Sequence, residues 1–329
     1  MERKTLVIME EKGWLLERFK SELKKEHSQY FTEVYTPDLV GIKAFWHIHG
    51  ITYFKRYYDY PENQLKEFVC GYKQELSPAQ ANIITTTTIH HIVPEKFDLK
   101  LFLIADQFID HYHVPCQRTY EQIRNYTKKP ITVLPFWVND KIYYSIDDKD
   151  FLRKKWGFDK DKYLIGSFQR DTEGYDLQTP KLEKGPDIFC DYVEKAHKDN
   201  PNLEVVLAGY RRQYIIKRLT EANIKFHYFE MCDTNSLNEL YNCLDLYVIS
   251  SRYEGGPQAA VEAAITKTPI ISTDVGFVGD YLAPESIAKD GDLFSTKPNT
   301  EYAYEKVQKL KMKNHMQNFV DFFQKLQPL

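Results

Sequence analysis

Two glutamates eight residues apart are the first residues in this chain whose type and spacing could do chemistry. They stand in the segment SSRYEGGPQAAVEAAITKTPIIS (250–272), where Glu254 precedes two glycines and Glu262 lies among alanines. A carboxylate inside an apolar helix is costly unless it is hydrogen-bonded. A ligand rich in hydroxyl groups, such as a sugar or a ribose, would supply those hydrogen bonds. In the alternative, structural interpretation, Glu262 pairs with a lysine and Glu254 is solvated.

The residues between the two glutamates predict a binding loop for an anion. The apolar segment 244–250 predicts a buried strand, and Pro257 suits the first position of the helix that follows. Backbone N–H groups near Gly255, Gly256 and Gln258 would then lie at the positive end of that helix, where phosphate groups bind. A diphosphate or the hydroxyl groups of a sugar fit such a site.

Apolar segments alternate with amphipathic ones along the whole chain. Strands are predicted at 5–10, 39–50, 82–91, 99–105, 131–136, 163–168, 203–209, 224–230, 244–250 and 269–274. Helices are predicted at 14–26, 119–127, 185–199, 235–244 and 311–326. This alternation predicts two α/β units, each with a doubly wound parallel sheet. Sheets of this kind bind ligands at the carboxyl ends of their strands.

The composition narrows the class of protein. The 329 residues carry a net charge of −3, which disfavours a nucleic-acid-binding protein. Five cysteines without any CxxC pattern indicate a reducing compartment and argue against a disulfide framework or a zinc cluster. No apolar run is long enough for a signal peptide or a membrane span. We therefore expect a cytoplasmic protein that could contact a membrane at its periphery and that has no nucleic-acid partner.

Further segments accompany Glu254 and Glu262 in a fixed order. They are TTIHH (87–91), ITVLPFWVNDKIYY (131–144), IGSFQRD (165–171), EKGPDIF (183–189) and STDVGFVGDYL (272–282). Together with the E-x7-E spacing of the two glutamates, these segments resemble the retaining glycosyltransferases of family 4. The resemblance covers roughly residues 80 to 295 and is specific for the superfamily rather than for a substrate.

The resemblance implies a GT-B fold, in which two Rossmann-like domains, each a doubly wound parallel sheet, face each other across a cleft. We expect an N-terminal, acceptor-side domain at 1–145 and a C-terminal, nucleotide-sugar-binding domain at 146–310. The charged segment 138–163 contains the expected boundary. The amphipathic tail at 311–329 is expected to form a helix that packs back on the N-terminal domain.

The resemblance also implies transfer of a hexose-type sugar from a nucleotide diphosphate sugar, UDP- or GDP-linked, to a hydroxyl acceptor. The acceptor would be a glycan, a glycolipid or a protein-linked sugar, and the anomeric configuration would be retained. No cofactor and no metal are expected, because a helix N-terminus and basic residues replace the cation. The sequence does not select the base, the sugar, the acceptor or the oligomeric state.

Four residues are expected to act at the reacting centre. Arg170 and Lys184 would stabilise the leaving diphosphate, and Glu254 would hold the transferred sugar. His90, at the end of a threonine-rich strand, would hydrogen-bond that sugar or stabilise charge. The alternatives are solvated surface cations for the two basic residues and an ordinary core or surface histidine for His90. The sequence also leaves open whether the histidine that faces the cleft is His90, His91 or His49.

The remaining expected contacts belong to donor binding. Glu262 would hold the ribose. The other residues assigned to the donor are Gly13, Ser167, Gly255, Gly256, Pro257 and Gln258.

Two patterns could be taken for metal sites. His111 and His113, with Asp106 and Asp110 nearby, lack the spacing of a closed tetrahedral site, so a solvated helix or loop is predicted there. The Asp-Gly-Asp at 290–292 has the form of an Asp-x-Asp metal motif but lies in turn-rich sequence.

Two other functions stay open. One is a different enzyme on the same scaffold, such as a nucleotide-sugar epimerase or a phosphorylase. A phosphorylase would need a pyridoxal-phosphate lysine motif, which the sequence does not show. The other is a non-catalytic GT-B partner subunit. The presence of all four charged donor-site residues argues against it, namely Arg170, Lys184, Glu254 and Glu262. The aromatic and basic segment 54–68 could contact an acceptor or a membrane surface, or simply pack.

Overall fold

The computed structural model describes residues 5–9, 15–28, 31–35, 86–107, 109 and 111–325. The chain divides into two compact units, one comprising 1–136 with 315–329 and the other comprising 137–314. The sequence placed the divisions at 145/146 and 310/311. Gly13, the predicted strand at 39–50, the segment 54–68 and Asp110 lie outside the described residues. No helix within the described part of the chain is both long enough and apolar enough to cross a membrane.

The second unit is built on a six-stranded, fully parallel sheet with the order β11-β10-β9-β6-β7-β8. Its strands are β6 (Tyr163–Ser167), β7 (Leu203–Ala208), β8 (Phe226–Phe229), β9 (Leu246–Ile249), β10 (Ile270–Thr273) and β11 (Ile287–Ala288). The sequence predicted the first five, and those predictions are confirmed. The chain runs outward from β6 to β8 and then returns to place β9 on the other side of β6. The strand order therefore reverses between β6 and β9.

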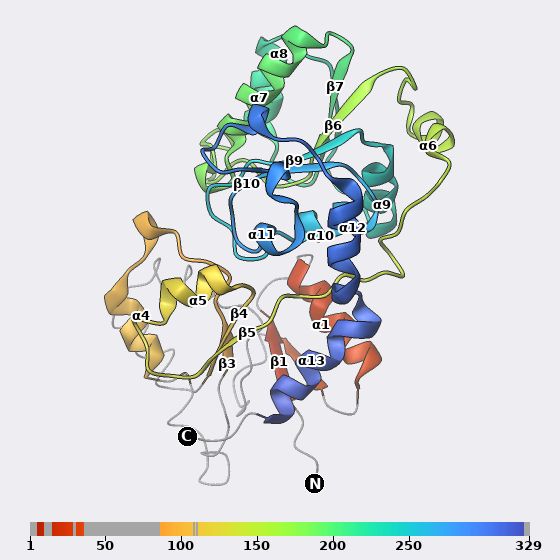
Figure 1. Cartoon of the computed structure of the whole chain (residues 1–329). Coiled ribbons are helices and arrows are strands. Elements are labelled where there is room, and N and C mark those ends of the chain that lie inside the picture. Colours follow the sequence, from red (N-terminus) through yellow and green to blue (C-terminus); the bar gives the residue numbers. More distant parts are fainter. Residues whose placement is uncertain are drawn as a thin grey trace. The chain divides into compact units, whose positions relative to one another are not determined.

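Helices cover this sheet, and they are α6 (Lys149–Trp156), α7 (Pro186–Asp199), α8 (Gln213–Glu221), α9 (Thr234–Cys243), α10 (Gln258–Ile265), α11 (Val278–Tyr281) and α12 (Thr300–Val307). Alternate residues of β7, among them Val205 and Leu207, pack with Phe189 and Val193 of α7 and with Leu219 of α8. Figure 1 shows α7 and α8 next to β7. All six residues of β7 are buried, as a central parallel strand requires.

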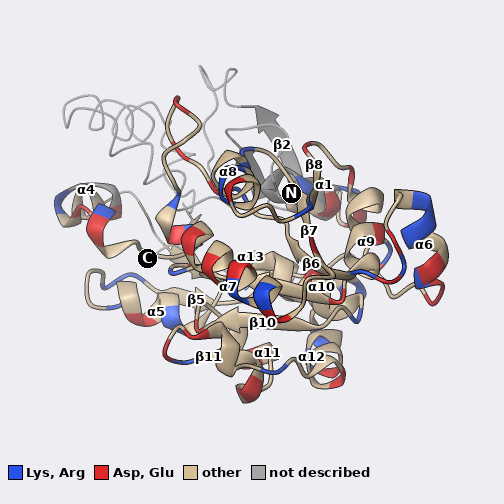
Figure 2. Ribbon diagram, turned by 90° about the horizontal axis from the view of Figure 1, so that it is seen from above, with Lys and Arg blue, Asp and Glu red and all other residues tan. Residues whose placement is uncertain are grey.

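Charged residues of this unit lie mostly outside the strands of the sheet, with Glu204 of β7 as the exception. Figure 2 shows acidic and basic residues along α6 and α7, whereas β10 carries none. The two ends of α6 show the residues that begin and end a helix. Asp148 caps it by accepting a hydrogen bond from Phe151 N, and Gly157 ends it with a φ of 73°.

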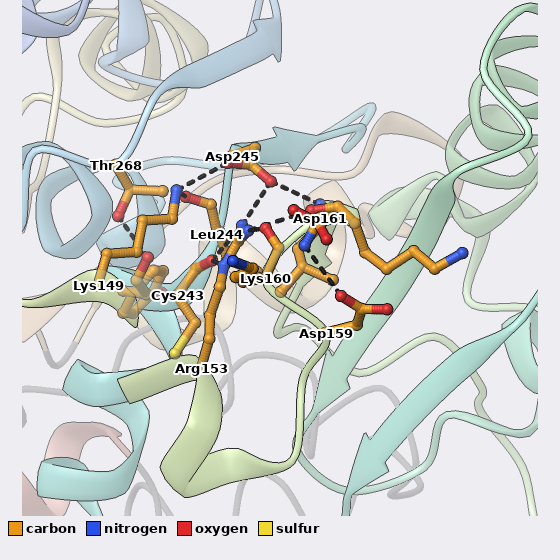
Figure 3. A network of polar contacts seen from close by, with 12 residues as sticks. Lys149, Arg153, Asp159, Lys160, Asp161, Cys243, Leu244, Asp245 and Thr268 are labelled. Carbon is orange, nitrogen blue, oxygen red and sulfur yellow. Dashed lines mark hydrogen bonds and ion pairs between the residues drawn. The ribbon is translucent and has the colours of Figure 1, made fainter. Parts of the chain in front are cut away.

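An ionic network around the buried Arg153 joins the amino ends of β6 and β9. Asp245 Oδ2 accepts hydrogen bonds from Arg153 Nη2 at 2.6 Å and from Leu164 N at 2.8 Å, while Oδ1 accepts from Lys149 Nζ at 2.7 Å (Figure 3). Arg153 also donates to the carbonyl of Cys243. Burial alone would raise the pKa of Asp245, but these hydrogen bonds and charges hold it below its ordinary value.

Among the described residues of the first unit, strands form two parallel sheets. One pairs β1 (Thr5–Met9) with β2 (Phe31–Tyr35), and the other has the order β3-β4-β5, with β3 (Thr86–Thr88), β4 (His111–Val114) and β5 (Ile131–Val133). Its helices are α1 (Leu15–Glu26), α4 (Leu99–Asp106), α5 (Gln117–Ile123) and, from His315 onward, α13 (Met312–Lys325). Phe319 of α13 stacks on Phe136, and so does Phe19 of α1.

The strand predicted at 99–105 is wrong, because this segment forms α4. A continuous apolar run does not distinguish a buried strand from a buried helix. Leucine, alanine and lysine favour a helix. In α4, Phe102 is buried, whereas Leu99 and Leu103, one turn apart, share an exposed side.

The solvated helix or loop predicted around His111 and His113 is also wrong. These residues lie on β4, the middle strand of its sheet, and His113 is only 2% exposed. The segment HYHV is only four residues long and contains two histidines, so its sequence gives a weak strand signal, and the strand depends on pairing with β3 and β5 on either side.

His113 is held as a neutral imidazole. Its Nε2 donates to the carbonyl of Leu134 at 2.7 Å, and its Nδ1 lies 2.9 Å from Thr88 Oγ1, which must donate to it. The ring meets Phe136 and Phe319 edge-on. Burial lowers the pKa of His113 to about 4 from its ordinary value of 6.5.

Acid should therefore destabilise the first unit. The folded pKa lies below the unfolded one, so between these values the unfolded chain binds a proton that the folded chain does not. The free energy of unfolding should fall by up to about 3 kcal/mol as the pH falls from 6.5 to 4. His113→Gln should flatten this dependence in urea unfolding measured across the range. His27→Gln, at the end of α1, is the control, and an unchanged slope in His113→Gln would contradict the assignment.

Candidate functional site

The candidate site lies at the carboxyl edge of the six-stranded sheet. The loops after β6 and β9 leave this edge at the point where the strand order reverses. In open parallel sheets, diverging loops at such a point leave a crevice in which ligands bind. The sequence-predicted residues Arg170, Lys184 and Glu254 lie on these two loops.

Lys184 and Glu254 meet although 70 residues separate them. Lys184 Nζ donates to Glu254 Oε1, and the two side chains are 22% and 12% exposed. Ser251 Oγ donates to the same oxygen at 3.1 Å and lies 3.3 Å from Gln169 Oε1, while Gln169 Nε2 donates to the Lys184 carbonyl. The structural alternative paired a lysine with Glu262 and left Glu254 solvated, whereas here the lysine pairs with Glu254.

Two glycines allow the backbone segments of the site to pack closely. At Gly185, with a φ of 59°, a Cβ atom would overlap the Ser250 carbonyl. At Gly276, with a φ of 49°, a Cβ atom would overlap the carbonyl of Gly255, which accepts from Phe277 N at 3.0 Å. The loop at 250–256 is therefore held by backbone on two sides.

The loop continues into α10. Pro257 caps this helix in an extended conformation, so the helix begins at Gln258, one residue later than predicted. Gln258 is 6% exposed and its Nε2 donates to the carbonyl of Trp137 at 2.8 Å. Its side chain thus fixes the start of the helix, and the backbone N–H groups of the first turn lie at the positive end of α10.

Glu262 lies within α10 and is 5% exposed. Tyr241, from α9, donates its hydroxyl to Glu262 Oε2 at 3.2 Å. Burial raises the pKa of Tyr241 well above its ordinary value, so the hydroxyl keeps its proton and remains a donor. One group that stabilises this buried carboxylate is therefore a tyrosine hydroxyl, which spacing along the sequence does not reveal.

Arg170 and Ser167 have internal partners at the end of β6. Arg170 Nε donates to the Thr172 carbonyl at 2.7 Å. Ser167 is buried, and its hydroxyl oxygen accepts from Arg212 Nη2 at 3.1 Å. Their donor-binding roles stay predictions.

His90 belongs to the first unit. It follows β3, its carbonyl accepts from Thr119 Oγ1 at 2.8 Å, and its ring stacks on Phe136 with centroids 5.6 Å apart. The contact with Phe136 fixes the ring plane. The role of His90 in catalysis also stays a prediction.

Sequence reasoning missed four residues that build this edge of the sheet, namely Gln169, Asp171, Arg212 and Ser251. Gln169 lies directly beside the predicted Arg170, and Ser251 stands in the segment SSRY (250–253). Their positions in these segments could therefore have identified both residues. Arg212 lies beyond β7 and joins the others only through the packing of β7 beside β6.

Within the ranges that the structure describes, no group of three or more His, Cys, Asp or Glu side chains could hold a metal ion. The Asp-Gly-Asp at 290–292 forms a turn, as its composition suggested. Gly291 has a φ of 77°, and Asp292 Oδ1 accepts from Phe294 N.

The family model described as Glycosyl transferases group 1 matches residues 148–321. The match covers more than half of the chain, so this protein belongs to that family. A curated relative, the lipopolysaccharide core biosynthesis mannosyltransferase LpsB of Rhizobium meliloti, is 25% identical over 158 residues. That alignment covers 46% of this chain and 42% of the relative, so the chain spans less than half of the relative's length.

Solved structures share the fold. HepE of Anabaena, solved in complex with UDP and glucose, superposes with a TM-score of 0.71 at 14% identity, covering 99% of this chain and all of that one. Sucrose-phosphate synthase of Thermosynechococcus elongatus has a TM-score of 0.65 at 16% identity, covering 94% of this chain and 77% of that one. The predicted GT-B fold of two Rossmann-like domains is confirmed.

Gly276 provides a test of how the loop is held. In Gly276→Ala, the added Cβ would push against Gly255 and sit on a left-handed backbone, so we expect a loss of about 2–4 kcal/mol in the free energy of unfolding. Gly279→Ala is the matched control, since nothing lies within 4 Å of its Cβ and it stands in α11. The control should gain up to about 1 kcal/mol. Equal urea midpoints for the two variants would refute the close contact.

Proposed function

We propose that this protein is a retaining glycosyltransferase of family 4 that moves a hexose-type sugar from a nucleotide diphosphate sugar to a hydroxyl acceptor. The observation that carries the proposal is the meeting of Lys184 with Glu254 at the reversal point of the sheet. Membership of the group 1 family supports it. The UDP and glucose bound to HepE and the mannosyltransferase from Rhizobium favour UDP- or GDP-linked hexoses as donors. The acceptor would be a glycan or a glycolipid.

The Lys184–Glu254 pair suits a donor in which a sugar is linked to a diphosphate. A lysine ammonium has three N–H donors, so it can hold Glu254 and a phosphate oxygen together. A carboxylate has about four acceptor positions on its two oxygens, so Glu254 can accept from a sugar hydroxyl in addition to its protein partners. Negative charge grows on the diphosphate as the glycosidic bond breaks, and Lys184 with Arg170 would stabilise that charge more strongly in the transition state than in the ground state.

The ribose would bind at Glu262. The Tyr241 hydroxyl orients this carboxylate, and two hydroxyl groups of a ribose would hydrogen-bond to it. Backbone N–H groups around Gly255 and Gly256, at the positive end of α10, would assist with the phosphate or the sugar. We further propose that the reaction is independent of a metal ion, because these groups together with Arg170 and Lys184 supply the positive charge.

Donor binding can be tested by thermal shift with UDP-, GDP- and ADP-sugars, with and without EDTA. One base should raise the melting temperature of the wild type by mass action, and EDTA should not change that rise. In Glu262→Ala the rise should disappear, because the ribose contact is lost.

The matched control is Glu204→Ala. Glu204 is equally buried but lies near the amino end of β7, where it pairs with His227 and Lys225. This variant should lower the melting temperature of the free protein and leave the ligand-induced rise intact. If no sugar nucleotide stabilises the wild type at millimolar concentration, the donor-binding proposal fails and a non-catalytic partner function takes its place.

Retention can be tested without an acceptor. Glycosyltransferases that bind a donor productively can transfer the sugar to water, and the configuration of the first product reports the stereochemistry. With an α-linked donor, NMR should show the α-anomer of the free sugar before it mutarotates. Release of the β-anomer first would overturn the retaining assignment, and Lys184→Ala should slow the release at least about 100-fold.

A further inference from the structure

A buried ion pair between Arg212 and Asp171 lies beside the candidate site. Arg212, at the start of α8, is fully buried. Its Nε donates to Asp171 Oδ2 at 3.2 Å, its Nη1 donates to the carbonyls of Ser167 at 2.8 Å and Ala208 at 3.1 Å, and its Nη2 donates to Ser167 Oγ at 3.1 Å. One guanidinium therefore binds the carboxyl ends of both β6 and β7.

Asp171 completes this arrangement from the loop after β6. Its Oδ1 accepts from Tyr214 N at 3.3 Å, so the carboxylate caps the N-terminus of α8, which has no cap from its own N-cap side chain. Burial raises the pKa of Asp171 above its ordinary value, and the charge of Arg212 opposes that rise. The carboxylate thus occupies the positive end of α8, where an anion would otherwise bind.

The backbone around the pair is strained and closely tied. Arg211 has a φ of 63°, a conformation that costs free energy for a residue other than glycine and persists where surrounding contacts enforce it. Its carbonyl accepts from Asp171 N at 3.1 Å and from Thr172 Oγ1 at 3.4 Å. Asp171 O in turn accepts from Lys181 N at 2.8 Å. The loop after β6 is therefore fixed directly on the C-terminal side of Arg170.

The same loop is fixed on the other side of Arg170. Phe168 N donates to Tyr247 Oη at 3.1 Å, and Ser167 is held by the Arg212 guanidinium. Gln169 contacts Lys184 and Ser251. Arg170 stands between two anchored segments, so the Arg212–Asp171 pair determines the direction in which the backbone presents it.

A buried ion pair is a poor way to gain stability. Desolvation of the two charges offsets their attraction, and apolar pairs of similar size are often as stable or more stable. What a hydrogen-bonded ion pair adds is a defined geometry. The four acceptors around Arg212 lie on two strand ends and one loop, so the pair fixes the position of this loop relative to both strands.

We propose that Arg212 and Asp171 form a positioning pair that holds Arg170 and Gln169 in the arrangement that binds the diphosphate of the donor. This inference rests on the proposed function, because it concerns the same donor site. Neither residue touches the donor in this role. The pair acts through the loop, so its loss should weaken the contact with the second phosphate and leave the nucleoside contacts intact.

The test compares dissociation constants for UDP and UMP, or for GDP and GMP if the wild type prefers guanine, by isothermal titration calorimetry. In Asp171→Leu/Arg212→Met the advantage of the diphosphate over the monophosphate should fall about tenfold, the size of a lost charge-assisted hydrogen bond. Monophosphate affinity should stay within about twofold. A purely structural pair would change the unfolding midpoint and leave the ratio unchanged.

The matched control is Arg153→Met/Asp245→Leu. That pair is also built on a buried arginine and also joins strand ends, but it does so at the amino edge of the same sheet, where the Asp245 side chain is 23% exposed (Figure 3). Its removal should leave the ratio unchanged. Arg212→Lys is the second variant for the case in which the double variant does not fold, since it keeps a cation beside Asp171 and loses the fork that binds both strand ends.

The outcomes separate the two proposals. If the wild type binds neither UDP nor GDP at millimolar concentration, the proposed function fails and the positioning role fails with it. If the wild type binds, and the double variant or Arg212→Lys keeps the wild-type ratio, the positioning role alone is overturned. A ratio reduced in these variants and unchanged in the control supports it.

Discussion

The ion pair between Lys184 and Glu254 is the interaction on which the candidate site depends. It exists because every strand of the six-stranded sheet is parallel, so all carboxyl ends lie at one edge. The reversal of strand order between β6 and β9 then brings together loops that are 70 residues apart. A positive charge elsewhere on the chain could not replace Lys184, because Glu254 would then be partly buried without a counter-charge beside it.

Two arginine–aspartate pairs, each built on a buried arginine, hold the strand ends at opposite edges of this sheet. Arg153 and Asp245 join the amino ends of β6 and β9, and Arg212 and Asp171 join the carboxyl ends of β6 and β7 to the next loop. In both pairs the guanidinium also donates to backbone carbonyls, which satisfies groups that the strands leave exposed at their ends. Rigid edges of this kind allow a binding loop to keep its shape without a ligand.

In the first unit, a neutral side chain rather than an ion pair joins the strands. His113 links β4 to β3 and to the segment after β5, and its environment of aromatic rings excludes the charged form. Phe319 of α13 packs on the same ring system, so the C-terminal helix completes a core that begins more than 200 residues earlier. A hydrogen-bonded imidazole fits there because both of its nitrogens have partners.

The sequence alone determined the fold class, since the alternation of apolar strands such as 203–209 with amphipathic helices is a local pattern. It also placed Glu254 and Lys184 in loops that follow strands, because short motifs at strand ends are local too, while their roles stay predictions. Tertiary structure decided what local patterns leave open. The segment 99–105 became a helix through one-sided burial, His113 became part of a strand through its neighbours, and Arg212 reached β6 through sheet order. Each of these depends on contacts between segments distant in the sequence, and spacing along the chain carries no record of them.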